Sequence, residues 1–184
     1  MVLLESQVKL KAGEDAPDFD LLGIDDKKHK LSDYREHQGI LIIFMCNHCP
    51  YVKAKFDAFN ELYEKFGEKI AIIGINSNDS EDYPEDSFEN MKKTAEEKGL
   101  KFDYLVDETQ QIAKKYGAMC TPDPFLFNKE GKLFFHGRID NAMKPDDDAT
   151  EKTMIINMEK MLSNEKIEKD FDPSIGCSIK WKEN

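Results

Sequence analysis

Two cysteines lie three positions apart in the segment Phe44-Met-Cys-Asn-His-Cys-Pro50. In a C-x-x-C pair the second thiol can attack a mixed disulfide that the first has formed, so that a target is reduced and released. The nucleophile is the thiolate, and unpaired N–H groups at a helix start favour that negative charge. Pro50, directly behind Cys49, suits a first helical turn because its missing N–H would have no partner there. The spacing therefore predicts thiol chemistry if a helix begins at this point.

The segments around the pair alternate between strand and helix patterns. The run from Ile40 to Met45 is apolar throughout, which is typical of a strand covered on both faces. Further strands are predicted at 70–75, 102–106, 125–127 and 132–135, and helices at 51–66, 84–98, 109–116 and 154–162. This order indicates a sheet with helices on both faces. Cys46 then falls at the carboxyl end of a central strand, where sites in such sheets collect.

Composition limits the class of protein. The 184 residues fit one domain, predicted over 1–184, and the formal net charge of -11 with a pI of about 4.9 argues against nucleic acid or an anionic membrane as partner. The start at Met1 to Glu5 lacks a secretory pattern, and the longest apolar run is too short to cross a bilayer. We therefore expect a cytoplasmic protein, in which a close cysteine pair is more often catalytic or metal-binding than structural.

Several motifs resemble the thioredoxin superfamily. The C-x-x-C follows the first core strand, and Thr121-Pro122-Asp123 resembles the loop where the superfamily carries a cis-proline facing the cysteines. The segment from Gly13 to Leu21 resembles the start of the peroxiredoxin-like (AhpC/TSA) branch, which places a small hairpin ahead of the core. Further similarities are Leu31-Ser-Asp-Tyr34, Gly137-Arg-Ile-Asp140 and the tail Ile175-Gly-Cys-Ser-Ile-Lys-Trp181. The resemblance implies a thioredoxin fold, with its core at about 13–162, an N-terminal hairpin extension and a C-terminal tail.

The two branches of this superfamily need different residues. Peroxiredoxins polarise peroxide with a threonine and an arginine, and here these positions hold Cys46 and Pro122. An efficient peroxidase would lack those donors unless Arg138 reached the site. Disulfide exchange needs only the pair, a helix start and the proline. The resemblance therefore implies a thiol-disulfide oxidoreductase, with Cys46 predicted to attack and Cys49 to resolve. If the protein follows the peroxiredoxins instead, Cys49 is the nucleophile and Cys46 the resolving thiol.

The predicted site follows from this resemblance. Its catalytic residues are Cys46, Cys49, His48 and Pro122; Asn47, Thr121 and Asp123 are predicted to bind substrate; and Cys120 and Arg138 are accessory candidates. The backbone of Thr121 is expected to pair with an extended target peptide. His48, directly before the second cysteine, resembles oxidising members in which a histidine stabilises the thiolate, and His48, Asp123 or water is the candidate proton acceptor.

Other readings stay open. No metal and no cofactor beyond the Cys46–Cys49 disulfide is expected, and the partners are a protein or small-molecule disulfide or thiol and an electron donor that the sequence does not identify. One alternative is a thiol peroxidase with Cys49 as the peroxide-attacking residue. Another is copper binding as in Sco-like proteins, with His136 as the distant ligand, although His136 is predicted to be a surface residue at a strand end. Cys177 is predicted to be a packed thiol.

Overall fold

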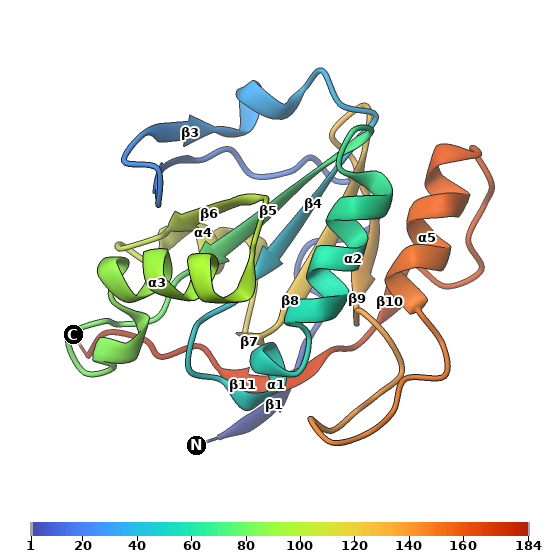
Figure 1. Cartoon of the computed structure of the whole chain (residues 1–184). Helices are drawn as coiled ribbons and strands as arrows, with labels where there is room; N and C mark the ends of the chain where they lie inside the picture. Colours follow the sequence, from blue (N-terminus) through green and yellow to red (C-terminus); the bar gives the residue numbers. More distant parts are fainter. Residues whose placement is uncertain (1, 184) are drawn as a thin grey trace.

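A computed structural model describes residues 2–183 as an eight-stranded mixed sheet with helices on both faces (Figure 1). The strand order is β10-β9-β8-β4-β5-β6-β2-β3. The strands are β2 (Asp20–Gly23), β3 (Lys28–Lys30), β4 (Gly39–Phe44), β5 (Ile70–Asn76), β6 (Asp103–Val106), β8 (Asp123–Asn128), β9 (Leu133–Gly137) and β10 (Phe171–Asp172). The predicted α/β class and thioredoxin fold are confirmed.

The centre of the sheet is formed by the most apolar segments. Every residue of β4 and β5 is buried, as the uninterrupted apolar runs predict for strands covered on both faces. The two strands are parallel, β5 is also parallel to β6, and β4 is antiparallel to β8. The register of β4 and β8 pairs Phe44 with Asp123. The carboxyl end of β4 therefore meets the start of β8, next to Thr121 and Pro122.

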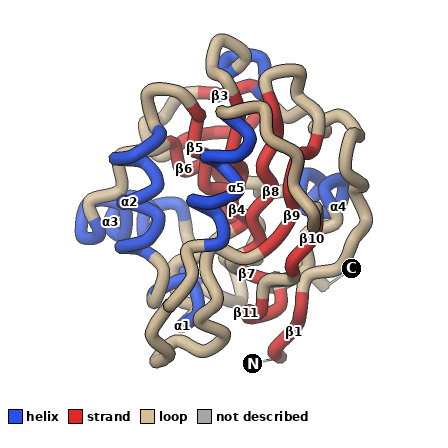
Figure 2. The backbone as a smooth tube through the Cα atoms, turned by 90° about the vertical axis from the view of Figure 1, so that its right-hand side faces the viewer, coloured by secondary structure: helices blue, strands red, loops and turns tan. Residues whose placement is uncertain are grey.

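Helices cover the sheet with two separate apolar clusters. The helices are α1 (Pro50–Lys53), α2 (Phe56–Phe66), α3 (Phe88–Lys98), α4 (Gln111–Tyr116) and α5 (Thr153–Leu162), with 3-10 turns at Leu31–Tyr34 and Pro84–Asp86. Figure 2 shows α2, α3 and α5 on one side of the sheet and α4 on the other. Side chains of α2, α3 and α5 share one buried cluster, and those of α4 pack in a second cluster with the N-terminal segment.

Three local details differ from or sharpen the sequence-based expectation. The helix predicted at 51–66 is split, because Lys55 leaves helical geometry between α1 and α2. The short helix α4 begins at Gln111, and the carboxylate of Asp107 accepts the N–H of Ala113 there at 2.9 Å. The N-terminal hairpin is confirmed, since β2 and β3 pair antiparallel at the sheet edge.

A second, three-stranded sheet joins both ends of the described chain to the cysteine region. Strand β11 (Ile175–Ser178) lies between β1 (Leu3–Glu5) and β7 (Cys120–Thr121), with antiparallel pairing on both sides. In Figure 1 the C-terminal segment, drawn in red, passes beside α1 and β7. Within residues 2–183, none of the helices has the length and apolar character needed to span a membrane.

Candidate active site

The two cysteines lie where β4 ends and α1 begins. Cys46 follows β4 by two residues, and Cys49 is the N-cap of α1 with Pro50 in its first turn. Both cysteines are fully buried, and neither they nor the other two cysteines form a disulfide. The predicted helix start behind the second cysteine is therefore present, although α1 has only four residues.

Thr121 brings the two sulfurs to the proline loop. The Cys46 Sγ lies 3.3 Å from the Thr121 hydroxyl, and the Cys49 Sγ lies 3.2 Å from the Thr121 carbonyl oxygen. The Thr121–Pro122 peptide bond is cis. The structure thus brings together Cys46, Cys49, Thr121 and Pro122, which the sequence analysis placed in one site.

The two thiols differ in their ability to ionise. Hydrogen bonds from the Cys177 and Cys46 side chains hold the pKa of Cys49 well below its ordinary range, with further support from the N–H of Val52. Burial raises the pKa of Cys46, and its hydrogen bond to Cys49 and the nearby charge of Asp86 act in the same direction. Of the two sulfurs, Cys49 is therefore the one whose charged form these contacts favour.

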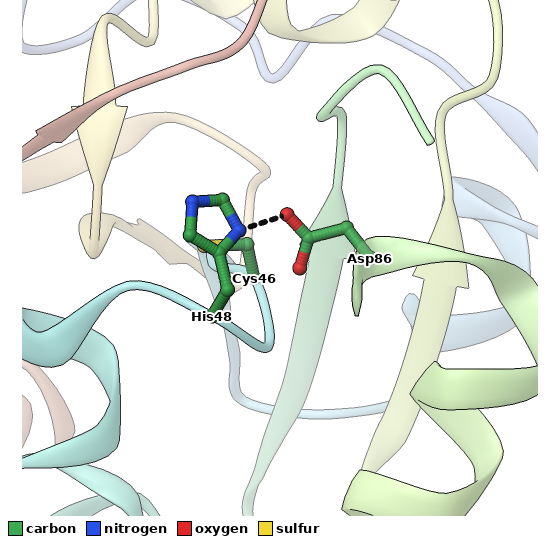
Figure 3. Close-up of side chains that lie close together, drawn as sticks. All are labelled: Cys46, His48 and Asp86. Carbon is green, nitrogen blue, oxygen red and sulfur yellow. Dashed lines mark hydrogen bonds and ion pairs between the residues drawn. The ribbon is translucent and has the colours of Figure 1, made fainter. Parts of the chain in front are cut away.

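Asp86 holds the loop between the cysteines in place. It lies in the 3-10 turn Pro84–Asp86, and its carboxylate is fully buried. One carboxylate oxygen accepts the Asn47 N–H at 2.7 Å, while the other accepts the Asn78 amide at 2.6 Å and lies 2.6 Å from His48 Nδ1. Figure 3 shows the His48 ring turned toward Asp86, with Cys46 beside it. The carboxylate therefore bridges the C-x-x-C loop to the loop after β5.

His48 combines this ion pair with an aromatic contact. Its ring stacks on Tyr83 at 5.5 Å between centroids, and its side chain is 15% exposed. The hydrogen bond to Asp86 raises the pKa of His48. A histidine that carries a proton close to a cysteine pair stabilises the thiolate by charge attraction. The hydrogen bond to Asp86 therefore supports the predicted role of His48 in stabilising the thiolate.

The raised pKa of His48 gives a testable pH dependence of stability. A group whose pKa is higher in the folded state stabilises fully below its unfolded value of about 6.5, and that contribution is lost as pH rises through the folded-state pKa. We expect the advantage of the wild-type protein over His48→Asn in free energy of unfolding to be larger at pH 6 than at pH 9. Urea unfolding across this range measures it, and an advantage that grows with pH would contradict the assignment.

Asp123 and His136 form a second buried pair behind the proline. His136 Nε2 lies 2.8 Å from Asp123 Oδ1, and its ring stacks on Phe125 at 3.9 Å. His136 is 1% exposed, so the prediction of a surface position was wrong: β10 pairs with β9 at this residue and covers it. Burial raises the pKa of Asp123. Burial also raises the pKa of Cys120, and the charge of Asp123 acts in the same direction.

Asn47 and Cys120 lie next to the cysteine pair and the proline, respectively, and both are buried. The polar groups of Asn47 are used internally, because its amide donates to the Glu85 carbonyl at 2.9 Å and its amide oxygen accepts the Tyr104 hydroxyl at 3.0 Å. This gives Asn47 a positioning role, and its substrate contact stays a prediction. Cys120 is buried beside Pro122, with its Sγ 4.0 Å from the Pro122 carbonyl oxygen.

Arg138 is bound by two acids and a hydroxyl group. Its guanidinium pairs with Asp172 at 3.1 Å and with Glu151 at 3.7 Å, and its Nε donates to the Thr153 hydroxyl at 3.3 Å. The acids of β10 and of the segment before α5 therefore bind its charge, and the accessory role of Arg138 stays a prediction.

Two residues at the site were missed or misjudged from the sequence. Asp86 is one of 37 acidic residues, and its Pro-Glu-Asp context carries no catalytic signature. Cys177 was predicted to be a packed thiol, and its 1% exposure confirms this, but its hydrogen bond to Cys49 was missed. The only sequence signal for Cys177 was its place in the family-like tail.

Fold and site together define a class of protein. A C-x-x-C at the junction of a central strand and a helix, facing a cis-proline loop on this mixed sheet, identifies a member of the thioredoxin superfamily. The sequence matches the AhpC/TSA family over residues 12–136, and the chain belongs to that family.

Known relatives agree with this assignment. Thiol-disulfide oxidoreductase ResA from Bacillus anthracis is 32% identical over 126 residues, which are 68% of each chain. The crystal structure of an uncharacterized conserved protein from Geobacillus kaustophilus covers 100% of this chain and 98% of its own, at 38% identity and a TM-score of 0.93. The thioredoxin domain of a thiol-disulfide oxidoreductase from Bacteroides vulgatus shares the fold, with a TM-score of 0.59 and 19% identity over 68% of this chain and 86% of that one.

Proposed function

We infer that this protein is a thiol-disulfide oxidoreductase that uses Cys46 and Cys49 as its redox pair. The observation that carries the proposal is that the two buried sulfurs, three residues apart at a helix start, both lie against Thr121 beside the cis-proline. Similarity to the ResA proteins supports the same reaction class. The substrate class is a protein or small-molecule disulfide, and an electron donor returns the pair to its reduced state.

The pKa directions favour Cys49 as the leading thiol, which is the reverse of the order first predicted. The Cys49 thiolate attacks one sulfur of a target disulfide, a mixed disulfide forms, and the other target sulfur leaves as a thiolate. Cys46 then loses its proton and attacks Cys49 Sγ, which forms the Cys46–Cys49 disulfide and releases the second target thiolate.

His48 and Asp86 are placed to handle the proton of Cys46. One ligand atom from each of Cys46, His48 and Asp86 lies within 4.8 Å of the others. Protonated His48 would first give its proton to the target thiolate that leaves in the attack by Cys49. The neutral imidazole would then accept the Cys46 proton as Cys46 attacks, and Asp86 would stabilise the resulting imidazolium. Within this proposal His48 replaces the buried acid that thioredoxins carry where this chain has Ile40.

The proposal is tested by reduction of insulin disulfides with dithiothreitol as the electron donor. We expect the wild-type protein to accelerate the reaction and Cys49→Ser to fall to the uncatalysed rate, because the leading thiolate is lost. Cys46→Ser should lose turnover by at least ten-fold, since the resolving thiol is replaced. Glu130→Ala is the control, an exposed position in the turn after β8 at the opposite end of that strand from Thr121, and should keep the activity. Full activity in Cys49→Ser would refute the proposal.

Two other functions have weaker support. A thiol peroxidase would need donors for peroxide, and Cys46 and Pro122 stand in the positions of its threonine and arginine while Arg138 is bound elsewhere. Copper binding through Cys46, Cys49 and His136 is opposed by the bond of His136 to Asp123. The cluster of Cys46, His48 and Asp86 has ligand spacing, but protein donors already satisfy the Asp86 carboxylate. Rapid oxidation of Cys49 by hydrogen peroxide, or stoichiometric Cu(I) binding, would revive these alternatives.

A further inference from the structure

The C-terminal strand occupies the place that the sequence analysis assigned to a target peptide. Cys177 of β11 pairs with Thr121, and Ser178 pairs with Cys120. In thiol exchange on this fold, the backbone before the proline is where an extended substrate would add as a strand. Here the chain's own tail takes that edge, and both cysteines of the pair are fully buried in this arrangement.

The tail is docked along its length rather than at one point. On its other side, β11 pairs with β1, with Leu4 opposite Gly176. Beyond β11 the carbonyl of Lys180 accepts the Asp79 N–H at 2.9 Å and the Gln110 amide at 2.7 Å. The Lys180 N–H in turn donates to the Asn78 side chain at 2.9 Å. Asn78 also bonds Asp86, so the tail is connected to the same network that holds the C-x-x-C loop.

Gly176 shows how closely the tail fits the proline loop. A Cβ atom placed on Gly176 would lie 2.0 Å from the Thr121 carbonyl oxygen and 2.6 Å from its carbonyl carbon. Side chains larger than hydrogen therefore cannot occupy this position without moving the strand. The contact is backbone against backbone, which a side-chain rotation cannot relieve.

The tail also brings a third thiol to the pair. Cys177 is 1% exposed, and its side chain and that of Cys46 both hydrogen-bond to Cys49. Cys49 therefore contacts both other sulfurs. The hydrogen bond to Cys49 and, after it, burial raise the pKa of Cys177, so its proton stays on it while Cys49 is the thiolate.

We propose that Cys177 is a third redox-active thiol, and that its disulfide with Cys49 locks the tail over the site. In the oxidised protein the Cys177 thiolate attacks Cys49 Sγ, so that a Cys49–Cys177 bond forms and the Cys46–Cys49 bond breaks. Cys46 leaves as a thiolate and takes up the proton that Cys177 gave up. The number of disulfides is unchanged, so this step needs no additional oxidant.

This inference rests on the proposed function and extends it to regulation of the same site. A target disulfide must displace β11 before it reaches Cys49, and the lock prevents that displacement. A donor that reduces Cys49–Cys177 restores the reduced pair and a tail that can detach. The protein would then act on targets only when its own tail is reduced.

Disulfide mapping tests the inference on the full-length protein. Reduced protein is oxidised with stoichiometric diamide, remaining thiols are blocked with N-ethylmaleimide, and tryptic peptides are analysed by mass spectrometry. Cys46 and Cys49 share the peptide 36–53, Cys177 lies in 170–180 and Cys120 in 116–129. A Cys46–Cys49 bond therefore stays within one peptide, whereas the proposed bond links 36–53 to 170–180.

Variants separate this inference from the proposed function. We expect the linked peptides in part of the oxidised wild-type protein, as the main product in Cys46→Ser, unchanged in Cys120→Ser and lost in Cys177→Ser. If Cys46→Ser stays folded by circular dichroism yet gives no linked peptides, the third thiol is refuted. If the wild-type protein forms the Cys46–Cys49 disulfide but no linked peptides, the Cys49–Cys177 disulfide is refuted and the proposed function still holds. If linked peptides form but the Cys46–Cys49 disulfide does not, Cys177 is redox-active and the proposal that Cys46 and Cys49 are the redox pair is refuted.

Discussion

A Gly176→Ala variant is expected to react with iodoacetamide at Cys49 about 5- to 150-fold faster than the wild-type protein. The added methyl group would meet the Thr121 carbonyl at 2.0 Å, so β11 must shift or detach. Overpacking of this kind costs about 1–3 kcal/mol, which corresponds to a rise of about 5- to 150-fold in the open population. Because Cys49 is fully buried with the tail in place, its alkylation reports that opening. The rate of labelling at limiting reagent measures the effect.

The matched control is Glu183→Ala, an exposed position in the same tail. It should leave the alkylation rate unchanged, because no packing against β7 is altered. Urea unfolding of each variant shows whether opening is local or global. An alkylation rate in Gly176→Ala that equals the wild-type rate, or that rises only as far as global destabilisation explains, would contradict a tail that covers the site.

Asp86→Ala is expected to lower the free energy of unfolding by about 3 kcal/mol or more. The substitution leaves the buried Asn47 N–H and Asn78 amide without their acceptor and removes the partner of His48. Each buried donor left unpaired costs about 1–3 kcal/mol, and breaking a buried ion pair costs about 3–5 kcal/mol. Since a domain is stable by only about 5–15 kcal/mol, the loss is a large share of the total. Urea unfolding at pH 7 measures it.

Asp82→Ala is the matched control for this substitution. Asp82 is exposed in the loop just before the 3-10 turn, and surface changes of this kind stay within about 0.5 kcal/mol. We also expect Asp86→Ala to slow insulin reduction, because the C-x-x-C loop loses its anchor and His48 its partner. A variant with near wild-type stability and activity would show that the carboxylate does not hold the loop.

Much of the fold could be predicted from local patterns. The apolar runs of β4 and β5 could belong only to covered strands, and the cysteine pair followed the first of them directly. The Thr-Pro-Asp loop before β8 was placed correctly for the same reason, since a short apolar strand followed it at once. Helix ends were less accurate: the irregular Lys55 that splits the predicted helix has no marker in the sequence.

What the sequence by itself determined is the fold and the position of the cysteine pair in it, because strand and helix patterns and the C-x-x-C spacing are local. Only the tertiary structure decided which groups surround the sulfurs. Asp86 reaches Asn47 across 39 residues of sequence, and Cys177 reaches Thr121 through a strand pairing that no periodicity encodes. The order of the thiols depends on those contacts, since hydrogen bonds from the tail and the pair acidify Cys49 while burial opposes ionisation of Cys46.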